Sequence, residues 1–231
     1  MATVAGVSLT WYTWLEQGRK ITASTQVIDA LARALRLDPV QHRQLRRLAG
    51  LADPVVPARL DEELSRLRRL VDAMSPAPAA VHDGCFDFVV WNDAFALVRT
   101  DPAALAPGRR NLLWWMYTDE RNRAVMRNWE AAARALLSQF RVLVGNNPGD
   151  PRLTRLVSEL SADSPEFRAW WSEYPLQDFR PSVIGIDHPE VGRIDLELFQ
   201  LRVVENPELL LVVQLPATED DRARISARLD A

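Results

Sequence analysis

The apolar residues near the N-terminus recur at the spacing of one helix face in three short segments. The first segment covers residues 9–17 and follows Ser8, a residue type that caps helix N-termini well. The second begins after Ser24, and the third begins after Asp38 with a proline in its first turn. We therefore expect an all-α head of three short helices.

A longer helical stripe of leucines follows at residues 58–74, after the interruptions at Pro54 and Pro57. The Ser-Pro-Ala-Pro run at residues 75–78 ends this stripe, because proline cannot continue a helix. We interpret residues 53–80 as a connector helix between two domains.

Strand-like and helical patterns mix after residue 80. Two short strands are expected at residues 80–82 and 86–91, with a hairpin turn at Asp83-Gly84. A short helix is expected at residues 92–98. Residues 111–127 carry an apolar run at 112–117 and then a polar turn. The later segments are expected to form helices at 129–144, 152–160, 165–173 (capped by Ser164) and 220–229, and strands at 183–187, 193–204 and 209–215.

The last strands indicate the fold class. In segment 193–204 the inward positions change phase near Leu198 and Phe199, which predicts a β-bulge. Segment 209–213 is continuously apolar, as is typical of a central strand covered on both faces. Strands come first and last with helices between them, so the terminal strands should meet in one antiparallel sheet. We expect an α+β fold with a PAS-like domain, in which inserted helices pack over the sheet with a cavity between.

Charge is distributed unevenly along the 231 residues, whose net charge is −3. Residues 1–52 contain seven basic and three acidic residues, whereas residues 81–231 contain 17 basic and 23 acidic residues. A basic head on an acidic body suits a nucleic-acid contact made by the head alone, although the charge of the head is modest.

Several classes of protein are disfavoured by composition and motifs. The chain has no apolar run of about 18 residues and no secretory signal pattern, so we expect neither a membrane span nor export. The lone Cys85 fits a reducing cytoplasm, and the scattered His and Cys residues do not suggest a metal site. No phosphate loop or nucleophile elbow is present, and His82, Asp83 and Cys85 lack an evident oxyanion hole, so we expect no enzyme and no cofactor.

Several motifs, in a fixed order, resemble one family of regulators. The matching segments are AGVSLTWYTWLEQGR at residues 5–19, VIDALARAL at 27–35, VWN at 90–92, RNLL at 110–113, WE at 129–130, DPRL at 150–153, LVSEL at 156–160, SPEFR at 164–168 and HP at 188–189. The head resembles the XRE family of lambda-repressor-like helix-turn-helix factors. The whole chain is more closely similar to the MmyB-like bacterial transcription regulators.

This resemblance implies a DNA-binding head, residues 1–52, and a ligand-binding domain, residues 81–231. The helix after Ser8 would lie in the major groove of double-stranded DNA, with Tyr12 and Leu15 facing the core of the head. A homodimer is expected, because such heads read two half-sites. The residues expected at bases and phosphates are Ser8, Leu9, Thr10, Thr13 and Trp14, and those expected near phosphates are Gln17, Arg19, Lys20 and Thr25.

The first two helices of the motif would precede Met1, so we expect the sequence to be shortened at its N-terminus and the complete protein to bind DNA. The alternative is a ligand-binding or dimerisation module that does not itself bind DNA. The nucleotides upstream of Met1 would distinguish these two readings.

The resemblance also implies a fatty-acid-like, apolar ligand in the second domain. The aromatic and aliphatic residues proposed for the wall of the site are Trp91, Phe95, Leu112, Leu113, Trp129, Leu136, Phe140, Trp170 and Phe199. The polar residues proposed to hold a carboxylate are Asn92, Arg109, Arg110 and Asn111, arginine because its fork binds carboxylates in bidentate fashion. The alternative for the apolar residues is ordinary core packing, and the alternative for each arginine is surface exposure.

Overall fold

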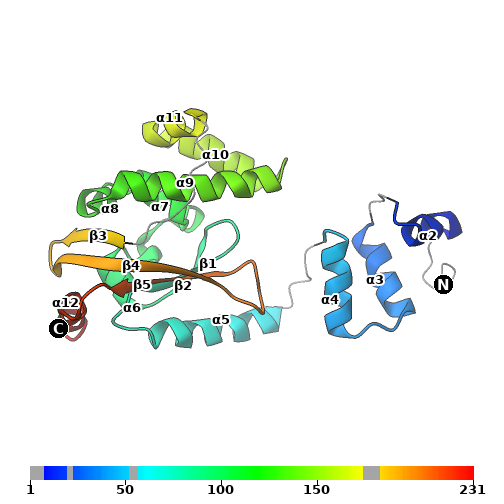
Figure 1. The fold of residues 1–231 in the computed structure, drawn as a ribbon, viewed down its shortest axis with the longest axis horizontal. Helices are drawn as coiled ribbons and strands as arrows, with labels where there is room; N and C mark the ends of the chain where they lie inside the picture. The colour runs from blue at the N-terminus through cyan, green and yellow to red at the C-terminus, as the bar shows by residue number, and fades with distance from the viewer. Residues whose placement is uncertain (1–7, 20–22, 52–56, 174–182) are drawn as a thin grey trace. The chain divides into compact units, whose positions relative to one another are not determined.

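The computed structural model describes residues 8–19, 23–51, 57–173 and 183–231 (Figure 1). The chain divides into two compact units, residues 1–60 and 61–231. The described part of the first unit is helical, and the second combines helices with one sheet, so the expected α+β class is confirmed. None of the helices in these ranges is long and apolar enough to cross a lipid bilayer.

The helices of the head begin where their capping residues predict. They are α2 (Leu9–Glu16), α3 (Thr25–Ala34) and α4 (Pro39–Leu48). The Ser8 hydroxyl accepts a hydrogen bond from the Trp11 amide at 3.1 Å, and the Ser24 hydroxyl accepts one from the Val27 amide at 3.5 Å. Each serine thus satisfies one amide that the first helical turn leaves without a partner.

The core of the head is formed around Ile28 and Leu31 of α3, which are both buried. Trp11 and Tyr12 of α2 are half-buried against this cluster, as expected for Tyr12. The expectation that Leu15 faces the same core is wrong, because Leu15 lies outside the cluster and is 37% exposed. Trp11 and Tyr12 are the α2 side chains that cover α3.

The second unit is organised around a five-stranded antiparallel sheet. Its strands are β1 (Ala79–His82), β2 (Phe88–Trp91), β3 (Val183–His188), β4 (Gly192–Arg202) and β5 (Leu210–Pro216), in the order β2-β1-β5-β4-β3. The first and last strands, β1 and β5, pair directly, as the order of elements predicts. β5 lies at the centre of the sheet and residues 211–214 are all buried, which confirms the expected central strand.

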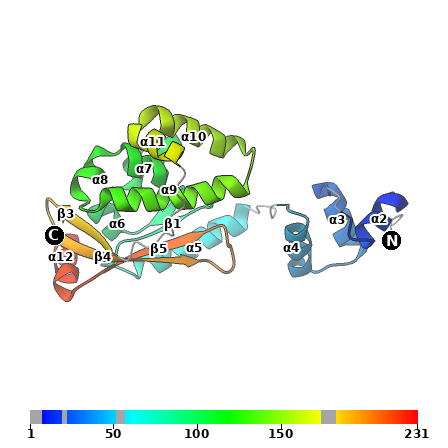
Figure 2. The same ribbon diagram turned by 45° about the horizontal axis from the view of Figure 1, so that its top comes forward.

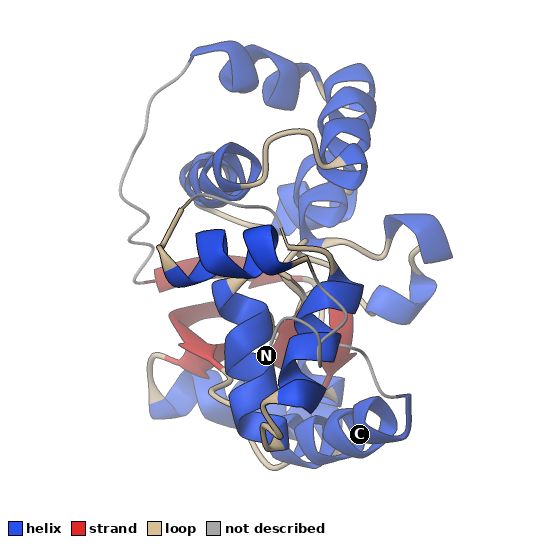
Figure 3. Ribbon diagram, turned by 90° about the vertical axis from the view of Figure 1, so that its right-hand side faces the viewer, coloured by secondary structure: helices blue, strands red, loops and turns tan. Residues whose placement is uncertain are grey.

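Helices cover both faces of this sheet (Figures 2 and 3). They are α5 (Pro57–Asp72), α6 (Asp93–Val98), α7 (Leu112–Thr118), α8 (Glu120–Val125), α9 (Trp129–Asn146), α10 (Pro151–Asp163), α11 (Pro165–Glu173) and α12 (Glu219–Leu229), with short 3-10 turns at Pro102–Ala104 and Pro107–Arg109. On one face, Leu67 and Val71 of α5 pack against Val81, Val90 and Val213. On the other, inner face, α7 to α11 build the helical layer that holds the larger core.

Asn92 ties three of these elements together. Its amide nitrogen donates to the carbonyl oxygens of Val71 (2.8 Å) and Ala77 (2.9 Å). Its side-chain oxygen accepts from the amides of Ala79 (3.0 Å) and Phe95 (2.9 Å). One buried side chain therefore caps α6, ends α5 and fixes the start of β1.

Two expected connections differ in the structure. The loop between β1 and β2 covers residues 83–87 rather than a two-residue turn at Asp83-Gly84, because the Asp83 carboxylate accepts the amides of Cys85 and Asp87, both at 2.9 Å. Phe86 adopts a positive φ of 68° in this loop and points into the core. The polar turn expected after the apolar run at 112–117 contains the helix α8, since Asp119 ends α7 and its carboxylate caps α8 by accepting the Asn122 amide at 2.9 Å.

The β-bulge expected near Leu198 and Phe199 is also wrong. β4 pairs with β5 in unbroken register through this point, and the register shift in the described sheet lies between β1 and β2, near Val81 and His82. Phe199 is 43% exposed on the α5 side of the sheet. The apparent change of phase arises because both faces of β4 carry apolar residues there.

We predict that Asn92→Ala lowers the free energy of unfolding by about 3 kcal/mol, because it leaves several buried backbone groups without partners. Asn92→Asp keeps both accepted hydrogen bonds but places an oxygen against two carbonyls, so it should also destabilise the protein. Denaturant unfolding followed by tryptophan fluorescence measures the change. Asp93→Ala, at the exposed neighbouring position, is the control, and equal stability of Asn92→Ala and Asp93→Ala would contradict the role given to Asn92.

Candidate functional site

A cavity of about 60 Å³ lies between the helical layer and the inner face of the sheet. Most of its wall is apolar, with a few polar side chains, which is the usual character of a small-molecule site. Its lining residues are His82, Phe95, Arg99, Leu112, Trp115, Met116, Met126, Ala132, Leu136, Ile184, Leu198, Gln200, Val212 and Gln214.

The alternation of side chains along the strands and the period of helix α6 direct three polar side chains toward this cavity. His82 lies two residues after Ala80 on β1, and Gln214 lies two residues after Val212 on β5, so each shares the inner face with its neighbour. Arg99 follows α6 one helical turn after the buried Phe95 and continues the same face.

Arg99 is a buried cation that has no acidic partner among the described residues. The side chain is 7% exposed, and its guanidinium carbon lies 4.7 Å from the ring centroid of Trp115. One of its nitrogens donates to the Met126 sulfur at 3.7 Å, whereas Nε and Nη1 have no hydrogen-bond partner in the described ranges. Burial lowers the pKa of Arg99 to about 9, so the guanidinium is still charged at neutral pH.

His82 is also buried without a partner. It is 1% exposed, its ring packs against Phe88 with centroids 4.6 Å apart, and neither ring nitrogen bonds to any described residue. Burial lowers the pKa of His82 to about 3, so the imidazole is neutral at physiological pH. A neutral imidazole offers one donor and one acceptor.

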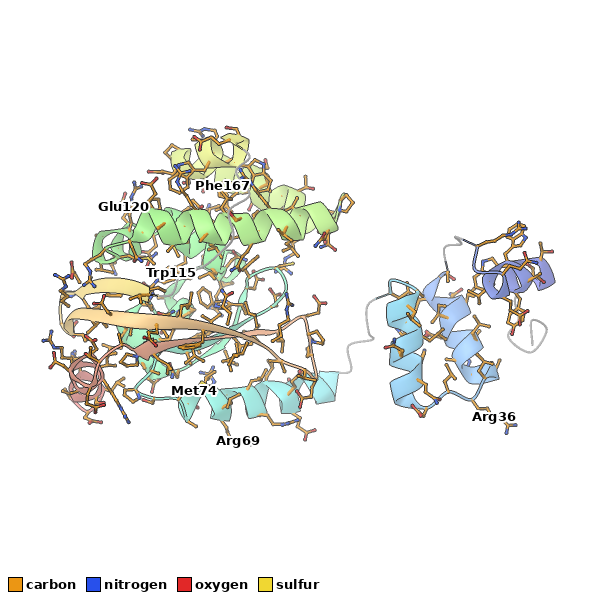
Figure 4. The ribbon with its side chains drawn as sticks, viewed as in Figure 1. Arg36, Arg69, Met74, Trp115, Glu120 and Phe167 are labelled. Atoms are coloured by element: carbon orange, nitrogen blue, oxygen red, sulfur yellow. The ribbon has the colours of Figure 1, made fainter. Side chains whose placement is uncertain are left out.

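Two further polar atoms in the cavity wall lack partners within the described part of the chain: Nε1 of Trp115 and the side-chain oxygen of Gln214. Figure 4 shows Trp115 between the helical layer and the sheet. Buried polar groups are almost always hydrogen-bonded, so four such side chains around one cavity indicate a site for a polar group of a ligand. Across the described residues, no cluster of three or more His, Cys, Asp or Glu side chains is placed to hold a metal ion.

The first unit presents a second candidate surface on α2. Thr10, Thr13, Trp14 and Gln17 are spaced as one helix face, and all four are exposed. The Arg19 guanidinium lies 5.9 Å from the Trp14 ring centroid, which places a positive charge beside that face.

Both units match known protein families. Residues 65–229 match the family model of the MmyB-like transcription regulator ligand binding domain, and residues 1–45 match that of a helix-turn-helix domain. This chain belongs to the MmyB-like transcription regulators. No curated protein matches the chain. The two matched families describe a ligand-sensing transcriptional regulator, and neither is a family of enzymes.

Three of the predicted ligand residues line the cavity of this regulator: Phe95, Leu112 and Leu136. The other six apolar ones lie elsewhere. Trp91 donates to the Asp101 carboxylate at 3.1 Å, and Phe199 lies on the other face of the sheet. The remaining aromatic ones, Trp129, Phe140 and Trp170, lie with Leu113 in the large core cluster, in ring contact with Tyr117, Phe167 and Trp171.

The predicted polar anchors also lie outside the cavity wall, because the fold uses their side chains. The Asn111 oxygen caps α7 by accepting the Leu113 amide at 2.9 Å. Arg110 donates to the Ala103 carbonyl at 3.4 Å, and Arg109 pairs with Asp163 at 3.0 Å. As described above, Asn92 holds four backbone groups.

The residues predicted to contact DNA are partly described. Ser8 and Thr25 lie at the exposed starts of α2 and α3, and the other described residues of this set, Thr10, Thr13, Trp14, Gln17 and Arg19, are exposed on or just after α2. The side chain of Leu9 and the whole of Lys20 lie outside the described residues.

Sequence reasoning missed His82, Arg99, Trp115 and Gln214. Two features of the sequence point to two of these residues. Gln214 interrupts a continuously apolar strand, and Arg99 extends the buried face of the short helix that contains Phe95. A polar residue in the buried phase of an element indicates either a hydrogen-bonded core group or a site.

The lowered pKa of His82 predicts a pH dependence of stability. The unfolded chain binds a proton below about pH 6.5 and the folded chain does not, so stability is complete above that pH and is lost as the pH falls toward the folded pKa of about 3. We predict that His82→Phe reduces the slope of unfolding free energy against pH by about 1.4 kcal/mol per unit between these limits. Denaturant unfolding at several pH values measures the slopes. Equal slopes for the two proteins would show that His82 is protonated in the folded state.

Proposed function

We propose that this regulator senses an apolar, fatty-acid-like carboxylic acid, whose carboxylate pairs with Arg99. The observation that carries the proposal is the buried Arg99 guanidinium, which has free Nε and Nη1 donors and no acidic side chain beside it in the described ranges. A carboxylate oxygen can accept a hydrogen bond from either free nitrogen, and an ionised hydrogen bond in a dry site is stronger than a neutral one.

The rest of the wall suits the remainder of such a ligand. Met116, Met126, Leu136 and Ile184 provide an apolar surface for a hydrocarbon chain, and methionine side chains adapt to irregular ligand shapes. The Nε1–H of Trp115 is a further donor for the acid group.

For the head, we propose that the exposed face of α2 enters the major groove of double-stranded DNA. Ser8, Leu9, Thr10, Thr13 and Trp14 would meet bases and phosphates, whereas Gln17, Arg19, Lys20 and Thr25 would approach phosphates. We further propose that the regulator works as a homodimer in the bacterial cytoplasm, since two half-sites require two heads.

Arg99→Met tests the ligand proposal, because methionine keeps an apolar chain of similar reach and removes the charge. We predict that the affinity of the delipidated full chain for dodecanoic acid falls about 10- to 100-fold in this variant, as expected for the loss of a charged hydrogen-bonded pair. Isothermal titration calorimetry measures the affinity.

Arg109→Met is the matched control, because Arg109 makes its ion pair outside the cavity. It should bind dodecanoic acid like the original protein. The free Arg99→Met protein should be at least as stable as the original, since the change removes a buried charge that pairs with no described acidic residue. Equal affinities of Arg99→Met and Arg109→Met would contradict the proposed pairing.

Thr10→Glu tests the DNA proposal. Glutamate in the first turn of α2 stabilises the helix, but its charge would repel DNA phosphates. We therefore predict that the affinity for the promoter of the protein's own gene falls about tenfold or more. Mobility-shift assays at low salt measure binding. Gln44→Glu, an exposed change on α4, provides the same added charge, and an equal loss in both variants would show that α2 is not the contacting face.

A further inference from the structure

The cavity contains hydrogen-bond acceptors as well as donors without partners. The donors are two nitrogens of Arg99 and the Nε1 of Trp115. The acceptors are the side-chain oxygen of Gln214 and one ring nitrogen of His82, since a neutral imidazole has an acceptor nitrogen in either tautomer. Both sets of atoms line one cavity.

A carboxylate alone can pair with the donors of this cavity but not with its acceptors. An ionised carboxylate accepts hydrogen bonds and donates none, so it can pair with Arg99 and Trp115 but leaves His82 and Gln214 without a donor. A hydrocarbon chain against these two groups would bury both acceptors without partners, which is costly.

None of the described wall residues donates to these acceptors. The aromatic neighbour of His82 is Phe88, which has no polar atom. The Gln200 side chain, which also lines the cavity, accepts from the Gln139 amide at 3.2 Å, and its own amide group donates neither to His82 nor to the Gln214 oxygen. Arg99 directs one nitrogen to the Met126 sulfur, and neither of its other two reaches His82 or Gln214.

We infer that the ligand is a hydroxylated carboxylic acid, in which at least one hydroxyl group donates to His82 or Gln214. A hydroxyl group has one donor and two acceptor sites, so it can also accept the N–H of the imidazole or of Trp115. This inference rests on the proposed function, because it places the carboxylate of the same ligand on Arg99.

The test compares the affinities of dodecanoic acid, 3-hydroxydodecanoic acid and 12-hydroxydodecanoic acid for the delipidated full chain by isothermal titration calorimetry. We expect at least one hydroxy acid to bind about tenfold more tightly than dodecanoic acid, because a site built for a hydroxyl rejects a ligand without one. His82→Phe or Gln214→Met should bring the ratio of the two affinities close to one. Gln44→Met makes the same chemical change in the first unit and should preserve the ratio.

The outcomes separate this inference from the proposed function. If all three acids bind equally and Arg99→Met weakens them all, the carboxylate site stands and the hydroxyl inference is overturned. A preference that survives in both His82→Phe and Gln214→Met also overturns it. If none of the acids binds, the proposed function fails and the inference fails with it.

Discussion

The buried charge of Arg99, which no acidic side chain in the described part of the chain neutralises, is the constraint on which the ligand-binding unit depends. Moving a guanidinium out of water costs several kcal/mol even after the protein relaxes. The ring of Trp115 and the sulfur of Met126 offset part of this cost, since a desolvated cation over an indole gains about 2 kcal/mol. The remaining cost favours an anion in the cavity, so ligand binding and the stability of this unit are linked.

Separate interactions fix the position of each wall of the cavity. Trp115 packs against Phe88 and Phe95, whose ring centroids lie 6.2 Å and 6.1 Å from its own. Asn92 fixes the start of α6, and hence the helix that ends at Arg99, through backbone hydrogen bonds. The cavity therefore lies between a helical layer and a sheet that are each well packed, and its polar groups cannot easily turn away to find other partners.

Local signals were enough to predict most of the elements. The helices that begin after Ser8, Ser24 and Ser164 follow the capping chemistry of single residues, and the pairing of β1 with β5 follows from the order of elements. The helix α8 was missed, because its residues are mostly polar and the sequence does not reveal that Asp119 caps a new helix.

The candidate site was predicted less well for a different reason. Asn92 and Asn111 have the chemistry of ligand anchors, but their amides are occupied by the backbone, which only the folded chain reveals. His82 and Gln214 are brought to one cavity by strand pairing between residues far apart in sequence. Apolar residues such as Phe95 and Leu136 line the cavity, yet core residues with the same pattern could not be told from them by sequence.

The ionisation of a bound acid tests the central claim most directly. Dodecanoic acid labelled with carbon-13 at its carboxyl group reports its own protonation through its NMR chemical shift. Pairing with Arg99 predicts that the bound carboxyl stays ionised at pH values below the pKa of the free acid, because a nearby cation favours the charged form. A bound carboxyl that takes up its proton at the same pH as the free acid, or at a higher pH, would contradict the pairing.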